Sequence, residues 1–338
     1  MKNKKYIFLT ASIFIAIIAV SFLLGFGVYA GKSQTGTDLG GLVLSEQEDR
    51  YFRLLVGGKD RASGLYDVIF LVSLDRQNGS ACVMQIPRDT YLEYTEGNYK
   101  KINGAPASLG GLGGLSEVLG EAMGIHLDGY LSIDLDAFGK AVDALGGVEV
   151  YVPETLYYND PSQNLSIYIP KGKQLLDGKS AEHFVRYRSG YLRGDIGRLD
   201  AQKIFMAALF EKISSELSVA DAIELAAEIL PNVSTDLTFF EISELISKGM
   251  AISSEKVFFV TAPGNDVVSE QSGAWYYVIS RVGVENILKS YFGAERNFDE
   301  NGWFFNANSK SATDIYNREQ SVNVTSVADI DKNGINIQ

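Results

Sequence analysis

Residues 67–86 read DVIFLVSLDRQNGSACVMQI, and this stretch decides the fold. Its first part, residues 68–74, is an almost wholly apolar run of the kind found in strands that are buried on both faces. The dipeptide Asn78-Gly79 follows and is a strong signal for a β-hairpin. Residues 81–86 are therefore expected to pair back antiparallel, with Cys82 as a buried strand residue rather than a nucleophile.

Further strands and helices surround this hairpin. Residues 51–56 predict a strand before it, and residues 153–164 are polar and predict an exposed excursion. Residues 129–133, 135–145 and 148–152 read strand, helix, strand, an order that predicts parallel neighbouring strands. The other predicted elements are helices over residues 199–213, 220–230, 239–250 and 282–292, and strands over residues 257–260 and 275–279. Together these patterns predict an α/β fold.

Composition excludes several classes of protein. The chain has 338 residues, of which 46% are hydrophobic, enough for a substantial core. A single cysteine excludes an internal disulfide and a cysteine-based zinc site, and the two histidines leave little room for a histidine-rich metal site. The formal net charge of -12 opposes the phosphate backbone, so no nucleic-acid partner is expected.

The N-terminus predicts an exported protein. Three lysines lie within residues 1–5, and residues 6–30 contain no charged side chain. This run is long enough to span a bilayer as an anchor, with residues 1–5 in the cytoplasm and the remainder outside. A cleavable signal peptide is the alternative, because Val28-Tyr29-Ala30 resembles a cleavage site. Residues 31–50 predict a short stalk.

The chain concentrates basic donors in one place, residues 186–203, which read RYRSGYLRGDIGRLDAQK. Arg186 and Arg188 project from one face if this segment is extended, and Arg198 and Gln202 share a face of the helix that follows. Converging guanidinium groups suit phosphate oxygens, so an anion site is the hypothesis. The alternative is an ordinary basic surface loop whose arginines pair with nearby carboxylates.

Two aspartates are candidates for a metal site. Asp60 and Asp67 lie beside the first two predicted strands, and Arg88 follows the third, so all three are expected at the strand ends of one sheet. Carboxylates beside phosphate-binding arginines suit Mg²⁺, a hard ion that prefers oxygen. The alternative is that both aspartates only form turns or are solvated.

Several motifs occur in a fixed order along the chain. They are Asp60 and Asp67, residues 86–90 (IPRDT), residues 101–103 (KIN), residues 143–150 (DALGGVEV), and Arg186-Tyr187-Arg188 with Asp195, Arg198 and Gln202. In this order they resemble the LytR-CpsA-Psr family of Gram-positive cell-envelope proteins. The resemblance implies a central mixed sheet layered between helices and an extracellular catalytic domain over residues 51–296. Residues 297–338 are polar and asparagine-rich, and this composition predicts a tail that is partly docked or disordered.

The resemblance also implies a reaction and a set of site residues. The reaction moves a glycopolymer, such as a teichoic acid or capsular polysaccharide, from a polyprenyl pyrophosphate carrier to a peptidoglycan sugar hydroxyl, with Mg²⁺. The implied pyrophosphate-binding residues are Arg88, Lys101, Arg186, Arg188, Arg198 and Gln202, the metal ligands Asp60 and Asp67, the bordering residues Asn103 and Asp195, and the catalytic residues Arg88, Asp67 and Arg188. The membrane is a further implied partner, with the polyprenyl chain in an apolar channel.

Three departures from the family pattern keep two alternatives open. Val68 stands where the family usually has threonine, the residues after Arg198 differ, and the loop from Asp60 to Asp67 is short. One alternative is a membrane-anchored binding or regulatory protein without turnover. The other is a pyrophosphatase that uses water as the acceptor.

Overall fold

The computed structural model describes residues 50–60, 63–93, 100–160, 165–188, 190–191, 194–269, 273–299, 302, 304 and 310–330. The predicted membrane anchor at residues 6–30 lies outside these ranges, as do residues 1–5 and residues 31–49 of the stalk. Within the described ranges, no helix is both long and apolar enough to cross a membrane. The anchor therefore stays a prediction from the sequence.

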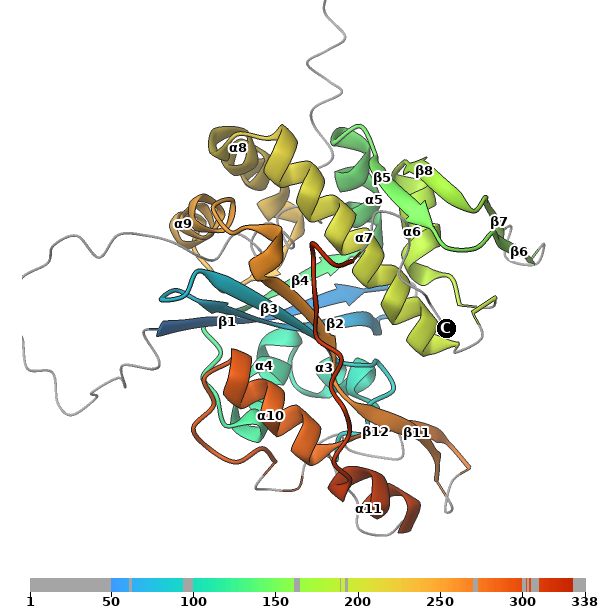
Figure 1. The fold of residues 1–338 in the computed structure, drawn as a ribbon, viewed down its shortest axis with the longest axis vertical. Helices are drawn as coiled ribbons and strands as arrows, with labels where there is room; N and C mark the ends of the chain where they lie inside the picture. Colours follow the sequence, from blue (N-terminus) through green and yellow to red (C-terminus); the bar gives the residue numbers. More distant parts are fainter. Residues whose placement is uncertain are drawn as a thin grey trace, which may run out of the picture.

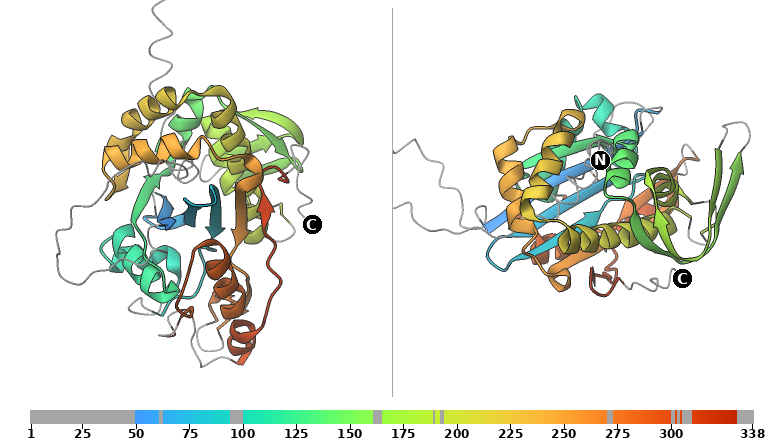
Figure 2. Two further views of the ribbon diagram at one scale, coloured as in Figure 1. Left: turned by 60° about the vertical axis from the view of Figure 1, so that its left-hand side comes forward. Right: turned by 90° about the horizontal axis from the view of Figure 1, so that it is seen from above.

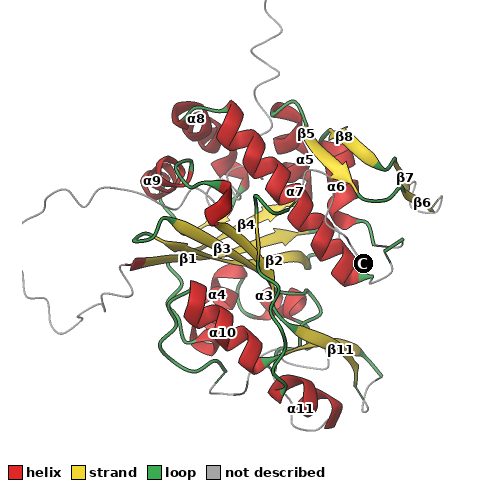
Figure 3. Cartoon of the chain, in the orientation of Figure 1, coloured by secondary structure: helices red, strands yellow, loops and turns green. Residues whose placement is uncertain are grey.

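A seven-stranded mixed sheet forms the centre of the molecule (Figures 1 and 3), in the order β13-β10-β3-β2-β1-β4-β9. The strands are β1 (Tyr51–Lys59), β2 (Tyr66–Asp75), β3 (Ser80–Gln85), β4 (Gly129–Asp134), β9 (Ser234–Thr235), β10 (Val257–Thr261) and β13 (Thr325–Ser326). The strands β1, β3, β4 and β10 run in one direction, and β2 lies antiparallel between β1 and β3. The predicted hairpin is confirmed, with Phe70 opposite Gln85 and Asp75 opposite Ser80.

The central strand β2 is buried on both faces, as its apolar run predicted. Phe70 and Val72 belong to one hydrophobic core, and Ile69 and Leu71 belong to the other. All four side chains are at most 2% exposed. Burial of each such side chain stabilises the fold by about 1.5–3 kcal/mol relative to leaving it exposed.

Helices cover both faces of the sheet (Figures 1 and 2). One core contains Phe138 of α5, Phe184 of α6 and Phe205 of α7, and the other contains Leu115 of α4 and Ile287 of α10. The helices are α3 (Ala105–Ser108), α4 (Leu112–Met123), α5 (Leu135–Ala144), α6 (Gly178–Arg186), α7 (Asp195–Glu216), α8 (Val219–Ile229), α9 (Phe239–Gly249), α10 (Arg281–Tyr291) and α11 (Lys310–Asn317). The prediction of a mixed sheet layered between helices is confirmed.

The strand β5 (Val148–Val152) does not join the main sheet, so the predicted parallel neighbours were wrong. It pairs antiparallel with β8 (Gly172–Leu176), while β9 occupies the place beside β4. The reason lies in its pattern, because Val148 and Val150 are buried while Glu149 is exposed. Burial on one face only is typical of a strand that is covered from one side, here by α7.

The predicted polar excursion over residues 153–164 contains a strand. This strand, β6 (Leu156–Asp160), pairs antiparallel with β7 (Leu165–Ile169). Two antiparallel pairs, first β5–β8 and then β6–β7, follow one another along a single two-stranded ribbon. This ribbon projects from the helical layer (Figures 1 and 2). A separate ribbon consists of β11 (Gly264–Val268) and β12 (Trp275–Ile279).

Residues beyond 296 add to the sheet and to both of its cores. The strand β13 pairs antiparallel with β10, with Ser326 opposite Phe258. Tyr316 of α11 is buried, and its hydroxyl donates a 2.5 Å hydrogen bond to Asp299 Oδ2. This segment was expected to be a polar tail, and its apolar anchors are few and widely spaced in the sequence.

Candidate functional site

The predicted site residues gather at one end of the main sheet. At this end, called here the site end of the sheet, β1, β3, β4 and β10 finish and β2 begins. Asp60 directly follows β1, Asp67 is the second residue of β2, and Arg88 lies three residues beyond β3. The topology thus brings together side chains that are 28 residues apart in sequence, as the strand pattern predicted.

Arg88 and Asp67 form the closest ion pair of this end. Arg88 Nη1 lies 2.5 Å from Asp67 Oδ1, and the side chains are 19% and 16% exposed. Arg88 Nε also lies 3.8 Å from Asp89 Oδ2. The backbone around Arg88 is fixed by Thr90, whose buried hydroxyl donates to the Pro87 carbonyl at 2.6 Å. The guanidinium is therefore held at the surface by carboxylates and remains accessible to solvent.

Lys101 and Asn103 lie against the same turn. Lys101 Nζ donates to Asp89 Oδ1 at 2.7 Å. The backbone amide of Asn103 donates to the Arg88 carbonyl at 3.2 Å, and the Asn103 side chain is buried. Both residues therefore lie beside Arg88, while the role of Lys101 in binding pyrophosphate and the place of Asn103 at the border of that site stay predictions.

Arg186 lies on a helix, so its predicted place on an extended segment was wrong. It is the last residue of α6, and Tyr187 ends the helix with φ −61° and ψ 138°. The helix forms because Asp177 caps its N-terminus, accepting a hydrogen bond from the Ser180 amide, and apolar residues recur at helical spacing. Arg186 Nη1 lies 2.7 Å from Glu182 Oε1, and Nη2 lies 3.8 Å from Asp60 Oδ2.

Arg188 differs from the other cations of this end. It follows Tyr187, its side chain is exposed, and it forms no ion pair with any residue that the structure describes. Glu182, by contrast, pairs with Arg186, as the alternative interpretation of a basic surface loop predicted for that carboxylate. Arg188 is therefore the guanidinium of this end with the greatest freedom to bind an anion.

Arg198 and Gln202 are buried in α7, where each is 3% exposed. The amide of Gln202 donates to the Val185 carbonyl at 3.1 Å, which ties α7 to α6. Gln85 Nε2 of β3 lies 3.5 Å from Gln202 Oε1. The predicted contact of Arg198 and Gln202 with pyrophosphate stays a prediction. Asp195 is the first residue of α7, and its side chain lies outside the described part.

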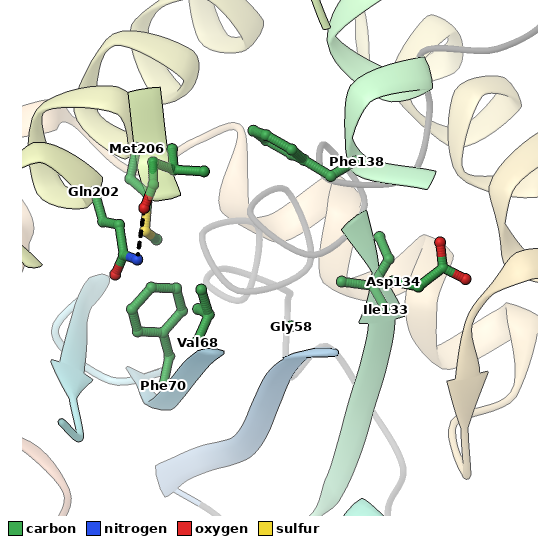
Figure 4. A pocket seen from close by; sticks show the side chains of 9 residues that line it. Gly58, Val68, Phe70, Ile133, Asp134, Phe138, Gln202 and Met206 are labelled. Carbon is green, nitrogen blue, oxygen red and sulfur yellow. Dashed lines mark hydrogen bonds between the residues drawn. The ribbon is translucent and has the colours of Figure 1, made fainter. Parts of the chain in front are cut away.

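A small apolar pocket, no larger than about one water molecule, lies between the sheet and the helices α5, α6 and α7 (Figure 4). Its lining residues are Gly58, Val68, Phe70, Ile133, Asp134, Phe138, Val185, Gln202 and Met206. Three of them, Gly58, Val68 and Val185, lie within two residues of Asp60, Asp67 and Arg186. The pocket therefore adjoins the charged cluster.

In the sequence, most of these lining residues look like ordinary core residues. Phe138 and Met206 follow the same helical spacing as their fully packed neighbours. One signal was present in Gly58, because a Cβ atom there would lie 3.0 Å from Val68 Cβ. A glycine inside a strand often marks a close approach of this kind.

Asp60 and Asp67 carry oxygen ligands of the kind that Mg²⁺ prefers, and their role as metal ligands stays a prediction. No group of three or more histidine, cysteine, aspartate or glutamate residues suited to a metal occurs in the described part of the chain. Asp60 accepts hydrogen bonds from Ser63 Oγ at 3.1 Å, and Asp67 is paired with Arg88. Because Mg²⁺ commonly takes one or two carboxylates plus substrate phosphates and water, two aspartates suffice.

Burial shapes the electrostatics of two groups near the sheet. Burial raises the pKa of the Tyr191 hydroxyl, which has no hydrogen-bond partner among the described residues. Tyr191 packs edge-on against Tyr187, with ring centroids 5.4 Å apart. Burial likewise raises the pKa of the Cys82 thiol, and Cys82 is 2% exposed, so the predicted structural role of this cysteine is confirmed.

Comparisons with known proteins agree with this architecture. Polyisoprenyl-teichoic acid–peptidoglycan teichoic acid transferase TagV of Bacillus subtilis (strain 168) is 29% identical over 245 residues, or 70% of this chain and 62% of TagV. The chain thus spans less than two thirds of that relative. The corresponding transferase TagU of Oceanobacillus iheyensis is 29% identical over 258 residues, 74% of this chain and 78% of TagU.

Solved structures show the same fold. The crystal structure of B. subtilis TagV aligns with a TM-score of 0.63 at 28% identity, covering 72% of this chain and 97% of that one. The structure of TagT bound to LIIa-WTA aligns with a TM-score of 0.59 at 23% identity, covering 74% and 92%. The sequence profile of the LytR_cpsA_psr family matches residues 30–292. The resemblance seen in the sequence is confirmed, and the chain belongs to the LytR-CpsA-Psr family.

Proposed function

We propose that the chain is a phosphotransferase that moves a glycopolymer of the teichoic acid or capsular polysaccharide type from a polyprenyl pyrophosphate carrier to a peptidoglycan sugar hydroxyl. One observation carries the proposal: a cluster of cations and carboxylates adjoins an apolar pocket at the site end of the sheet. Such a pair of surfaces matches a ligand with a charged head and an apolar chain. The relatives named teichoic acid transferases support the same reaction class.

The cations bind the pyrophosphate. Arg88 and Lys101 share Asp89, and Arg186 contacts Asp60 and Glu182, so each is already positioned by carboxylates. A pyrophosphate competes for these donors with more charge than a single carboxylate, and guanidinium groups bind its oxygens with two parallel hydrogen bonds. Arg188, which pairs with no carboxylate among the described residues, adds a further donor.

We place the first isoprene units of the carrier at the apolar pocket, which has to widen to admit them. Val68, Phe70 and Phe138 present only hydrocarbon to it, as the side chains in Figure 4 show. Burying such a chain contributes about 25 cal/mol per Å² of apolar surface removed from water. The pocket thereby selects a lipid-linked pyrophosphate over a soluble one.

The transfer step exchanges a phosphoanhydride bond for a phosphate ester bond. The oxygen of the peptidoglycan hydroxyl forms a bond to the phosphorus that carries the glycopolymer, and the bridging P–O bond to the second phosphate breaks. Polyprenyl phosphate leaves, and the hydroxyl proton passes to a carboxylate of Asp67 or Asp60. Arg88 and Arg188 neutralise the charge that develops on the phosphoryl oxygens.

Magnesium is the proposed cofactor, held by Asp60 and Asp67. When bound, it supplies further neutralisation of phosphate charge. Residues 6–30 are the proposed single membrane span, with the catalytic domain outside the cytoplasm and close to its lipid-linked substrate.

One incubation separates this function from the two alternatives. The full-length chain in detergent is mixed with a polyprenyl-pyrophosphate-linked glycopolymer, Mg²⁺ and peptidoglycan stripped of attached polymer. Polyprenyl phosphate together with peptidoglycan-linked polymer supports the transferase. Free phosphorylated glycan in the presence of acceptor identifies a pyrophosphatase instead, and donor binding without any product identifies a binding protein.

A further inference from the structure

The ribbon formed by β6 and β7 has one wholly exposed face. Tyr157 and Tyr168 lie directly opposite each other in the register and are 65% and 69% exposed. Asn159 and Ser166 lie opposite each other two residues further along the two strands, so they project from the same face, and both are also exposed. The other face is buried, as Ile167 at 4% exposure shows. This exposed set of Tyr157, Asn159, Ser166 and Tyr168 is called here the tyrosine face.

The tyrosine face is linked directly to the proposed transfer site. The hydroxyl of Tyr187 donates to the backbone carbonyl of Tyr157 at 3.1 Å. Tyr187 lies between Arg186 and Arg188 in the sequence, and β7 packs against α6, the helix that ends at Arg186. A polymer lying along the ribbon therefore leads to the cations of the site.

The composition of this face indicates its ligand. Two aromatic rings alternate with an amide and a hydroxyl, and none of the four side chains is ionised at neutral pH. Aromatic rings with polar tips contact the apolar faces of a ligand while hydrogen-bonding its polar groups. None of these four side chains is a cation that would attract an anionic polymer. The face also lacks the continuous apolar strip that binding to a lipid surface would require, because Asn159 and Ser166 interrupt it.

We propose that the tyrosine face binds the sugar backbone of peptidoglycan and holds the acceptor beside the transfer site. The proposal rests on the proposed transferase function, because it names the surface that receives the acceptor of that reaction. The hydroxyl-rich, uncharged sugar backbone fits the rings, amide and hydroxyl of this face. The tyrosines act by positioning the acceptor, since the reacting atoms lie at the arginines.

Co-sedimentation with stripped peptidoglycan tests the proposal. The full-length chain in detergent is compared with the Tyr157→Ala/Tyr168→Ala and Tyr157→Phe/Tyr168→Phe double variants. The alanine variant is expected to bind about tenfold more weakly, and the phenylalanine variant within about threefold of the wild type, because it keeps both rings. Phe240→Ala is the matched control, since Phe240 is 74% exposed on α9, and it is expected to bind like the wild type.

A second readout separates this inference from the proposed function. Binding of a polyprenyl-pyrophosphate-linked donor is measured for the same variants, and the alanine variant is expected to bind it like the wild type. Unchanged peptidoglycan binding in the alanine variant overturns the tyrosine face as the acceptor surface, as does an equal loss in Phe240→Ala. A failure of the transferase itself appears separately, as a wild-type chain that binds the donor and forms no product.

Discussion

Replacing Arg88 by alanine removes the cation that is most firmly placed at the site end of the sheet. Arg88 Nη1 lies 2.5 Å from Asp67 Oδ1, with both side chains less than one-fifth exposed. A unit charge about 4 Å from a phosphate oxygen contributes about 4 kcal/mol at an effective dielectric constant of about 20. Removal of a single donor of this kind typically costs about 2.7–4 kcal/mol in the transition state. We therefore expect kcat/KM for polymer transfer to fall by about 10²–10³-fold.

The same substitution has a smaller effect on stability. Asp67 loses its guanidinium partner but keeps contact with solvent, so the free energy of unfolding should fall by about 1–2 kcal/mol. Arg88→Lys keeps the charge and loses the two-pronged geometry, so its rate should lie between those of alanine and the wild type. Arg281→Ala is the matched control, because Arg281 lies on α10 and pairs with Glu285 at 3.2 Å.

Transfer is measured with the full-length chain in detergent, and folding is checked by thermal denaturation. Arg281→Ala should transfer polymer at the wild-type rate. A folded Arg88→Ala protein that retains more than about one-third of the wild-type kcat/KM would refute the role of Arg88, because that loss corresponds to less than about 1 kcal/mol.

Three further substitutions probe other parts of the structure. Asp67→Asn should raise the Mg²⁺ concentration for half-maximal activity by about tenfold, and an unchanged magnesium titration argues against Asp67 as a ligand. Val68→Phe should fill the apolar pocket and raise KM about tenfold for a long polyprenyl donor but not for a short-chain one, and equal effects on both donors exclude the pocket as the lipid site. Burial raises the pKa of Asp75, but hydrogen bonds from Arg50 and two backbone amides outweigh this effect and hold that pKa below its usual value. Because the folded pKa is depressed, this stabilisation is present above about pH 4 and is lost as the pH falls through the folded pKa. Asp75→Asn should therefore show a shallower loss of unfolding free energy on acidification, and a slope equal to that of the wild type contradicts this reasoning.

The centre of the fold could be predicted because its local signals agree with one another. The apolar run of β2 requires burial on both faces, and Asn78-Gly79 permits only a tight reversal, so the β2–β3 hairpin follows from local chemistry. The pairing of β5, by contrast, was predicted wrongly. Val148 and Val150 alternate with polar neighbours, and this one-sided pattern indicated a strand outside the main sheet, but the order of strand, helix and strand suggested a crossover.

The positions of the site residues at the strand ends could be predicted from the sequence. The secondary structure around Arg186 could not. Asp60, Asp67 and Arg88 follow from strand boundaries, which the apolar runs define. Arg186 was predicted to lie on an extended segment. It lies in α6 instead, because Asp177 caps the N-terminus of this helix and Phe184 is buried on its apolar face. The resemblance implied an apolar channel, but the residues that line the apolar pocket could not be predicted, since a void between packed elements depends on side-chain volumes from several distant segments.

The proposed transfer is tested most directly by following one phosphate. A donor is prepared with radioactive phosphorus in the phosphate bonded to the glycopolymer, and the full-length wild type is incubated with it, Mg²⁺ and stripped peptidoglycan. We predict that the label enters peptidoglycan with release of one polyprenyl phosphate per transfer, and that Arg88→Ala fails to do this. Label that stays on the lipid, or that appears as free phosphorylated glycan, contradicts the proposed transfer.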